Sequence, residues 1–141
     1  MGLYRSGLNL AAVGLVWMAN GAVAATSSLP PGAVVGNWIN PKRNVTVSTA
    51  MCGKLLCGTV TSASPDAQAA ARKAGAPPLV GTRLLRDYKQ TGANRWQGKV
   101  FVPDRNDSYY STIRQIDVNH LKISGCILGG LLCKSQVWER Q

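Results

Sequence analysis

The sequence predicts an all-β domain, a single small antiparallel up-and-down β-barrel of about eight strands with one short helix. Short segments of alternating apolar and polar residues recur along the chain, and turn-forming residues separate them. The sequence lacks the strand–helix–strand alternation that is typical of a parallel sheet. Tryptophans near both ends of the domain indicate that the first and last strands are neighbours, as barrel closure requires.

Each predicted strand follows the two-residue period of a half-buried sheet. In residues 45–51, for example, Val45, Val47 and Thr49 share one face, while Thr46 and Ser48 lie on the other. Asparagine, glycine and proline residues mark the turns between such segments. The predicted strands are 34–40, 45–51, 55–61, 82–88, 95–102, 108–116, 119–125 and 132–139.

One segment, 64–81, departs from the strand pattern. Ser64 is a residue type that caps helices, and Pro65 is suited to a first helical turn. An alanine-rich stretch follows, and a glycine and two prolines then end it. We therefore expect a short helix from Pro65 to about Ala74.

The first residues have the features of an export signal. Arg5 supplies a positive charge, an apolar run follows, and Ala22-Val23-Ala24 is a small-x-small cleavage pattern. The apolar run is shorter than the roughly 20 residues that a membrane span requires. We expect a signal peptide at 1–24 that is cleaved after Ala24, a leader at 25–33, and one barrel domain at 34–141 that is exported to the periplasm or secreted.

Four cysteines form two close pairs, and an oxidising compartment would make them disulfides. Three connectivities are open. We favour local pairing, Cys52 with Cys57 and Cys126 with Cys133, because both spans fit tight turns between strands, and each bridge would stabilise the fold by about 2–2.5 kcal/mol. The alternative is a four-thiolate zinc site, although the second spacing is wider than usual for zinc and export disfavours free thiols.

The chain is strongly basic, with 16 Lys and Arg against six Asp and Glu and a net charge of +10. Such a charge favours an anionic surface, such as lipid head groups or a cell-wall polymer. Nucleic acid is not expected as a partner of an exported chain. Positive residues are denser from 83 to 99, and from these we select Arg83, Arg86 and Arg95 as anion-contacting candidates.

The two ends of the domain carry a matching pair of motifs. Gly36-Asn37-Trp38 opens the first predicted strand, and Arg140 closes the last. In a closed barrel these ends are neighbours, so the Arg140 guanidinium can stack on the Trp38 ring at one barrel end. The combination resembles the lipocalin-like (calycin) signature of an early G-x-W and a late arginine.

A more specific resemblance covers residues 36–140. Its motifs are Gly36-Asn-Trp38, Cys52-Gly-Lys-Leu-Leu-Cys57-Gly58, Pro78-Leu-Val-Gly81, Trp96-Gln-Gly98-Lys-Val100 with Pro103, Tyr109 and Ser111, Leu121-Lys-Ile-Ser-Gly125-Cys126, and Cys133-Lys-Ser-Gln-Val-Trp138-Glu-Arg140. Together they resemble the exported bacterial proteins grouped as domain-of-unknown-function family 2147. The chain departs from that pattern at Ser64-Pro65-Asp66 and at Asp107-Ser108. The resemblance implies export and a lipocalin-like barrel, and it implies no activity.

Two functions from different classes fit this barrel. The first is binding of a small apolar or anionic ligand at the barrel mouth, where such sites commonly occur. An eight-stranded barrel has room for side chains or one small ligand, so we expect a shallow or filled cavity. The second is an envelope or extracellular protein-interaction module with a solid core and no ligand. The candidate ligand-lining residues are Trp96, Trp138, Met51, Val100 and Ile113, with Trp38 and Val47 beside them.

We expect no enzyme activity, because the residues form no catalytic constellation. His120 is the only histidine, and its position beside Asn119 indicates an exposed turn. Asp104 and Asp107 lie in a segment typical of a hairpin loop. We further predict no cofactor, no metal and no nucleic acid, and we expect a monomer whose partners are a small-molecule or lipid ligand, an anionic envelope surface or a protein.

Overall fold

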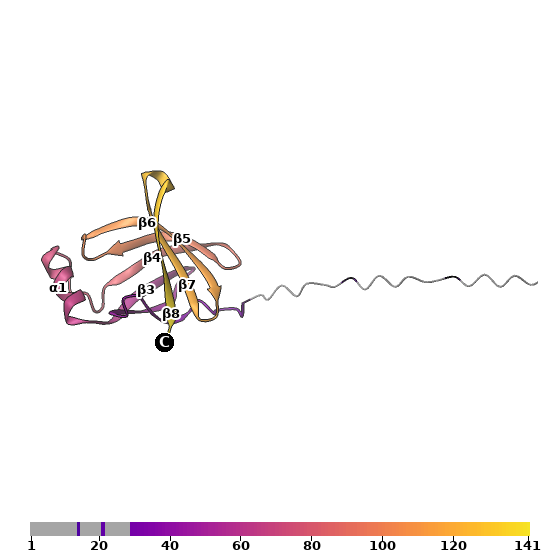
Figure 1. Cartoon of the computed structure of the whole chain (residues 1–141), viewed down its shortest axis with the longest axis horizontal. Helices are drawn as coiled ribbons and strands as arrows, with labels where there is room; N and C mark the ends of the chain where they lie inside the picture. Colours follow the sequence, from indigo (N-terminus) through magenta and orange to yellow (C-terminus); the bar gives the residue numbers. More distant parts are fainter. Residues whose placement is uncertain (1–13, 15–20, 22–28) are drawn as a thin grey trace, which may run out of the picture.

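The computed structural model describes Gly14, Gly21 and residues 29–141, and it confirms the closed antiparallel barrel of eight strands with one helix (Figure 1). The predicted signal peptide lies outside the described residues apart from the two glycines. The elements are β1 (Gly36–Ile39), β2 (Val45–Cys52), β3 (Leu55–Ala63), α1 (Pro65–Lys73), β4 (Arg83–Gly92), β5 (Arg95–Val102), β6 (Asp107–Asp117), β7 (His120–Ile127), the short 3-10 turn η1 (Leu128–Gly130) and β8 (Leu132–Arg140).

Each strand pairs with its neighbours in the sequence, and pairing of β1 with β8 closes the barrel. The closure is short, because only Trp38 with Arg140 and Ile39 with Glu139 are in register across it. By contrast, β7 and β8 pair along their whole length, up to Ile127 with Leu132. The β7–β8 hairpin therefore continues beyond the point where β1 ends.

The barrel interior is filled with side chains. Alternate residues of each strand point inward and form one hydrophobic cluster. Gly98 has a packing role, because a Cβ there would lie 2.6 Å from the Arg86 carbonyl oxygen and 2.8 Å from Cγ of Tyr88. The buried members of the cluster are Val34, Trp38, Val47, Leu56, Val60, Ala71, Leu79, Leu84, Leu85, Tyr88, Trp96, Phe101, Ile113, Leu121, Ile123 and Trp138.

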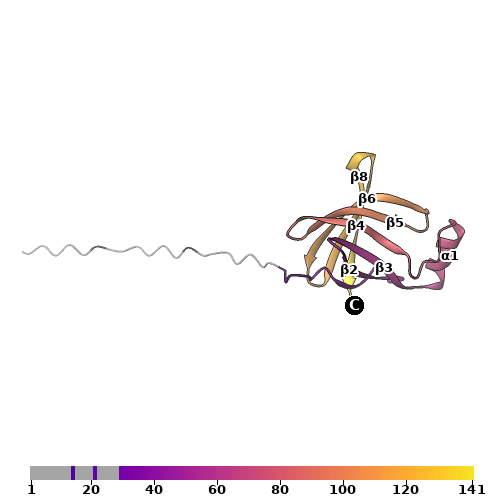
Figure 2. The same ribbon diagram turned by 180° about the vertical axis from the view of Figure 1, so that it is seen from behind.

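Helix α1 lies at the side of the barrel, apart from the β7–β8 hairpin (Figures 1 and 2). The Ser64 side chain caps it by accepting a hydrogen bond of 3.1 Å from the Ala67 N–H. Its buried Ala71 belongs to the same cluster as Leu84 and Phe101. Leu84 and Phe101 alternate with inward-facing residues of β4 and β5, so they lie on the outer face of the sheet. Helix α1 and the segment after it therefore cover an apolar patch on that outer face.

The observed elements differ from the predicted ones mainly at their ends. The first strand starts at Gly36 and not at residue 34, because the preceding residues form turns in which Ala33 donates to the Pro30 carbonyl and Val35 to the Gly32 carbonyl. Strand β4 runs on to Gly92, four residues past its predicted end, because β5 offers partners along it. No described helix has the length and apolarity needed to cross a membrane.

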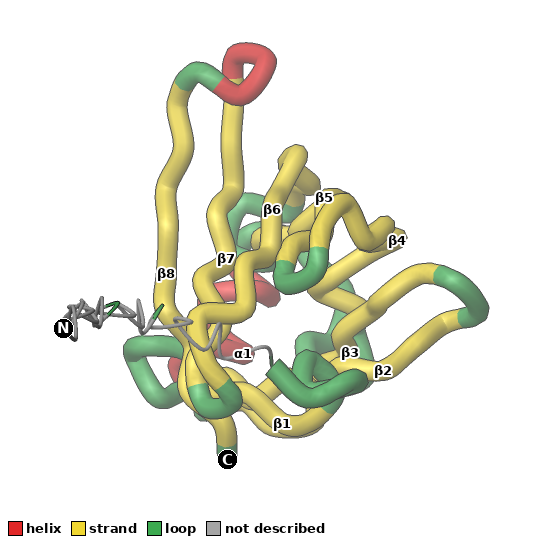
Figure 3. The backbone as a smooth tube through the Cα atoms, turned by 90° about the vertical axis from the view of Figure 1, so that its right-hand side faces the viewer, coloured by secondary structure: helices red, strands yellow, loops and turns green. Residues whose placement is uncertain are grey.

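Figure 3 shows the β7–β8 hairpin standing out from the rest of the barrel, and Figure 1 shows the same projection from another side. Strand β8 is exposed along most of its length, since Trp138 is its one buried residue. Between Leu132 and Val137 its pairs are all with β7. The sequence predicts the two strands but not the projection, which depends on the shortness of β1.

Candidate functional site

The barrel is closed at one end by Arg140 and Trp38. The Arg140 guanidinium carbon lies 4.2 Å from the centroid of the Trp38 ring, a cation–π geometry. Arg140 also donates hydrogen bonds to the carbonyls of Ala33, Val35 and Val118, at 3.1 Å for Val35 and 2.6 Å for Val118. The side chain thus ties the residues before β1 to the β6–β7 turn, so its role in the structure is to seal this end.

Gly36 and Thr49 complete the closed end. A Cβ on Gly36 would collide with the Arg140 guanidinium, which explains the glycine in the Gly-x-Trp motif. The Trp38 Nε1–H donates to the Val34 carbonyl at 3.1 Å and to the Thr49 hydroxyl at 3.0 Å. The single polar atom of the tryptophan side chain is therefore satisfied inside the protein.

Both cysteine pairs form local disulfides in the structure. Cys52 and Cys57 lie across the β2–β3 turn with a Cα–Cα distance of 6.0 Å, and Cys126 and Cys133 lie at the base of the β7–β8 tip at 4.1 Å. The two bridges are on different hairpins, so the four sulfurs do not meet at one zinc ion. Disulfides of this kind indicate an oxidising compartment.

The predicted ligand-lining residues do not form one cavity in the barrel. Trp138 and Ile113 are buried in the hydrophobic cluster, as is Trp96, and Val100 packs against it. Met51 continues the inward-facing series of β2 but is 53% exposed, because it lies beside the β2–β3 turn beyond the packed interior. The sequence identifies which residues of each strand face the barrel interior. It does not reveal that their side chains fill that interior.

Three buried polar atoms lie in the interior without a hydrogen-bond partner among the described residues. They belong to the hydroxyls of Tyr88 and Ser111 and to the amide nitrogen of Gln115. Burial raises the pKa of Tyr88 well above its usual range, and the neighbouring Ser111 hydroxyl offsets a small part of that rise. Ser111 and Gln115 are four residues apart on β6, and the Tyr88 hydroxyl neighbours that of Ser111 in the packed core.

A row of cations crosses the outer face of the sheet. Arg95 of β5 is directly opposite Arg114 of β6, and Arg114 is directly opposite Lys122 of β7. We call these three residues the basic ladder. Directly opposed side chains of this kind have Cβ atoms about 4.5–5.5 Å apart, and like charges there are destabilising. All three are exposed, and within the described residues none has a carboxylate within salt-bridge distance.

Two adjoining hollows lie on this outer face. The smaller, of about 290 Å³, contains the basic ladder. The larger, of about 850 Å³, lies at the base of the β7–β8 tip. Thr112 and Ser124 border both, so the two hollows form one continuous surface. The side chains of the larger one include Tyr109, Tyr110, Cys126, Leu128 and Cys133.

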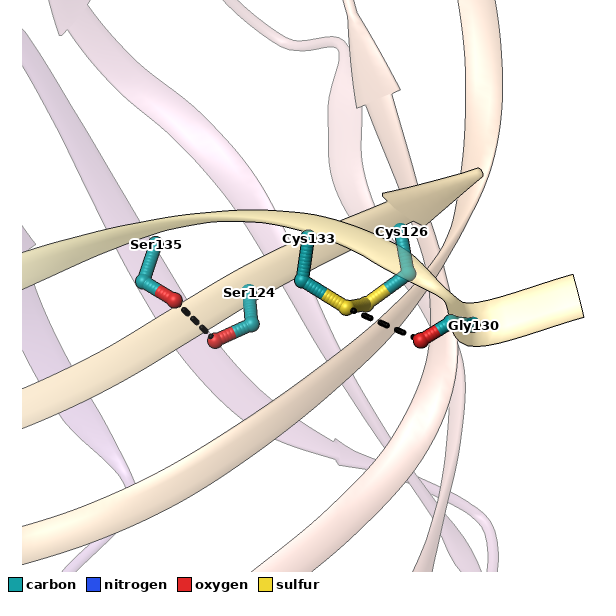
Figure 4. The surroundings of a disulfide bond; sticks show 5 residues. All are labelled: Ser124, Cys126, Gly130, Cys133 and Ser135. Carbon is teal, nitrogen blue, oxygen red and sulfur yellow. Dashed lines mark hydrogen bonds between the residues drawn. A yellow bond between two sulfur atoms is a disulfide. The ribbon is translucent and has the colours of Figure 1, made fainter. Parts of the chain in front are cut away.

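Figure 4 shows the base of the tip. The Cys126–Cys133 disulfide and the Ser124–Ser135 pair project from the same side of the hairpin. The two serine hydroxyls are hydrogen-bonded at 2.7 Å, and the Cys133 Sγ lies 3.5 Å from the Gly130 carbonyl oxygen. The surface therefore changes from cationic at the ladder, through hydroxyl groups, to sulfur and apolar carbon at the tip.

The three predicted anion-contacting arginines are not together. Arg83 begins β4, whereas Arg95 pairs with Gly92 at the other end of that strand. Arg86 is held against the Phe101 ring at 4.5 Å and donates to the Arg83 carbonyl and the Ser108 hydroxyl. Only Arg95 joins the ladder. Sequence reasoning missed its partners, Arg114 and Lys122; both occupy outward positions in alternating strands, but their register could not be read from the sequence.

The residues considered for catalysis remain apart. His120 Nδ1 lies 2.8 Å from an Asp117 carboxylate oxygen at the β6–β7 turn. The Asn119 backbone N–H, and secondarily His120, lower the pKa of Asp117. Asp107 accepts a hydrogen bond from the Ser108 N–H on the β5–β6 side, away from His120. Among the described residues, no three His, Cys, Asp or Glu side chains gather as a metal site would require.

The family called DUF2147, "Uncharacterized protein conserved in bacteria", matches residues 36–140, which is most of the chain. The chain belongs to this family. Among solved structures, it is similar to HP1028 from Helicobacter pylori, a protein described as belonging to the lipocalin family. The identity is 16% and the TM-score 0.59, and the match covers 76% of this chain and 82% of that one. At this identity the likeness shows the fold alone. No protein of curated function matches the DUF2147 chain.

Proposed function

We propose that this DUF2147 protein is an exported, non-catalytic binding protein for a small anionic amphiphile. The ligand has an anionic group and an apolar part, and it lies across the two hollows on the outer face of β5, β6 and β7. One observation carries the proposal: three cations, without a salt-bridge partner in the described part of the chain, stand in direct register beside a hollow that becomes apolar. A fold that keeps an arrangement of like charges has a destabilising interaction that an anion would relieve.

The geometry sets the orientation of the ligand. Its anionic group would bind the basic ladder, and Thr112 and Ser124 would contact polar atoms next to that group. Lys122 and Cys126 are four residues apart on one strand, which is about 13 Å. The apolar part would extend over this length to Tyr110, the Cys126–Cys133 disulfide and Leu128. A hollow of about 850 Å³ is within the size range of small-molecule sites.

The proposal moves the expected ligand from the barrel mouth to the outer face of the sheet. The barrel resembles a fold whose interior can hold one small ligand. In this chain tryptophans, Tyr88 and aliphatic residues occupy that space. The filled interior also fits the solid-core interaction module expected as the alternative, but such a module does not account for the adjoining cationic and apolar hollows.

Calorimetric titration with decyl phosphate tests the proposal. We expect saturable binding to the purified protein, and at least about tenfold weaker binding for the double variant Arg95→Gln/Arg114→Gln, because charge-assisted contacts are lost. The matched control Lys42→Gln/Lys54→Gln removes the same charge from exposed sites elsewhere and should bind as the parent does.

Two further readouts make the result specific. Uncharged decanol should bind much more weakly than decyl phosphate. The ladder variant should unfold at the same temperature as the parent or higher, because a like-charge pair is removed. Equal decyl phosphate affinity in the ladder and control variants would overturn the proposal.

A further inference from the structure

The tip of the β7–β8 hairpin is an exposed apolar segment. Residues 127–132, between Cys126 and Cys133, contain only isoleucine, leucine and glycine. We call this segment the apolar tip. The exposed fractions of its four large side chains are 47% for Ile127, 66% for Leu128, 85% for Leu131 and 57% for Leu132. A contiguous group of such side chains at the end of a projection is typical of an interaction site.

The local backbone holds the tip open. Leu128 has φ 54°, a left-handed conformation that leucine rarely adopts, and Gly129 and Gly130 continue it with φ 65° and 92°. Leu131 closes the turn by donating to the Leu128 carbonyl at 3.3 Å. The disulfide directly behind the turn constrains its two strands. The leucines therefore point outward from a constrained loop and do not fold back on the barrel.

The tip is also free to reach a flat surface. Figures 1 and 3 show it at the end of a hairpin that stands out from the barrel body. Pairing of β8 with β1 involves only Glu139 and Arg140, so the rest of β8 extends past its neighbour. A planar partner can approach the tip without meeting the rest of the barrel first.

The charged residues around the apolar tip favour an anionic partner. From Val118 to Trp138 the chain has no aspartate or glutamate, whereas Lys134 directly follows Cys133 and Lys122 lies further down β7. The neighbouring β5–β6 turn has Asp104 and Arg105, Asp107 begins β6, and the whole chain has a net charge of +10. Apolar residues at an end with cations behind them are the combination that binds the interface of anionic lipid bilayers.

We propose that the apolar tip inserts into the interfacial region of a bilayer that contains anionic phospholipid, with Lys134 at the level of the head groups. The protein is then peripheral to the membrane and reversibly bound, because four aliphatic side chains give only modest membrane affinity. The tip shares Leu128 with the apolar end of the proposed ligand site, but membrane insertion does not require the basic ladder, so the basic-ladder variant separates the two proposals.

Flotation with lipid vesicles tests it, using processed protein purified from cells with both disulfides formed. Vesicles of phosphatidylglycerol and phosphatidylethanolamine should bind the protein, and phosphatidylcholine vesicles should bind it much less. We expect Leu128→Ser/Leu131→Ser to reduce binding at least about fivefold. The matched control Met51→Ser/Val80→Ser changes two exposed apolar residues elsewhere, of 53% and 48% exposure, and should bind normally.

A second measurement reports insertion directly. The added tryptophan of Leu131→Trp should shift its emission to shorter wavelength with phosphatidylglycerol vesicles, whereas the basic-ladder variant should float like the parent. Equal binding by the tip and control variants would overturn the proposal. So would an absence of binding together with tip-dependent dimerisation in size-exclusion chromatography, which would assign the tip to a second copy of the chain.

Discussion

A disulfide closes both the β2–β3 hairpin and the β7–β8 hairpin, but the two hairpins differ in how much of their apolar surface is buried. Both contain adjacent leucines, Leu55-Leu56 in the β2–β3 hairpin and Leu131-Leu132 in the β7–β8 hairpin. Leu56 is fully buried, whereas Leu132 is 57% exposed. Leu56 is in register with Met51 on one side and with Tyr88 of β4 on the other, but Leu132 is in register with Ile127 alone. Exposure here depends on whether a second neighbouring strand exists, not on residue type.

The length of each loop reinforces this difference. Four residues separate Cys52 from Cys57, so Leu55 and Leu56 are already part of β3. Six residues separate Cys126 from Cys133, and two of them are glycines with left-handed backbone. The longer loop carries its leucines past the last position at which β6 pairs with β7, at Tyr110 and Cys126. The first hairpin therefore contributes to the core, and the second is available for contact with a partner.

The largest expected effect comes from truncating Leu56, and the same truncation at Leu132 is its comparison. Leu56→Ala should reduce the free energy of unfolding by about 2–5 kcal/mol, because it leaves a cavity in the packed interior. Leu132→Ala should change it by less than about 0.5 kcal/mol, since the side chain contacts mostly solvent. Urea denaturation of both variants checks the pair. Similar losses in both would mean that the tip packs against the barrel and that the contrast between the hairpins is mistaken.

Removing each disulfide separately sharpens the comparison. Cys52→Ser/Cys57→Ser and Cys126→Ser/Cys133→Ser should each lower stability by about 2–2.5 kcal/mol, as expected from the small loops that they close. Vesicle binding should fall only in the second variant, because only that bridge holds the apolar tip. Thermal unfolding and flotation of the same samples separate the two effects. Loss of vesicle binding in the first variant as well would indicate general unfolding and not a local role.

A smaller effect is expected at the closure between β1 and β8. Arg140→Lys keeps the positive charge but removes the planar group that stacks on Trp38 and donates to three carbonyls. We expect a loss of about 1–3 kcal/mol in stability, the range for breaking hydrogen bonds to a charged group. Hydrogen exchange should show faster opening of β1 and of the residues before it. Unchanged hydrogen exchange in β1 would show that backbone pairing of β1 with β8 is enough to close the barrel without the Arg140 side chain.

The sequence predicted those features that depend on local patterns. Alternation located all eight strands, and Ser64 with Pro65 located the start of α1. The pairing of Cys52 with Cys57 followed from short spacing across a turn, and the closeness of Trp38 to Arg140 followed from the two ends of a closed sheet. Each inference used neighbours in sequence or a general property of barrels, so none required knowledge of register.

The features that were missed all depend on contacts between distant segments. Arg114 and Lys122 look like ordinary outward residues until register sets them beside Arg95. Met51 has the right alternation to line the interior, but its place beside a turn leaves it exposed. The exposure of Leu131 could not be predicted either, because an apolar run between two cysteines is equally compatible with a buried turn.

By itself, the sequence determined the fold class, the strand segments, the closing motifs and the excess of positive charge, because periodicity and composition act within one segment of chain. The tertiary structure alone decided that the barrel is filled, that three cations form a ladder and that the second disulfide hairpin extends past its neighbours. These properties arise from the register and the unequal lengths of strands, which the chain sets only when all eight pack around one core.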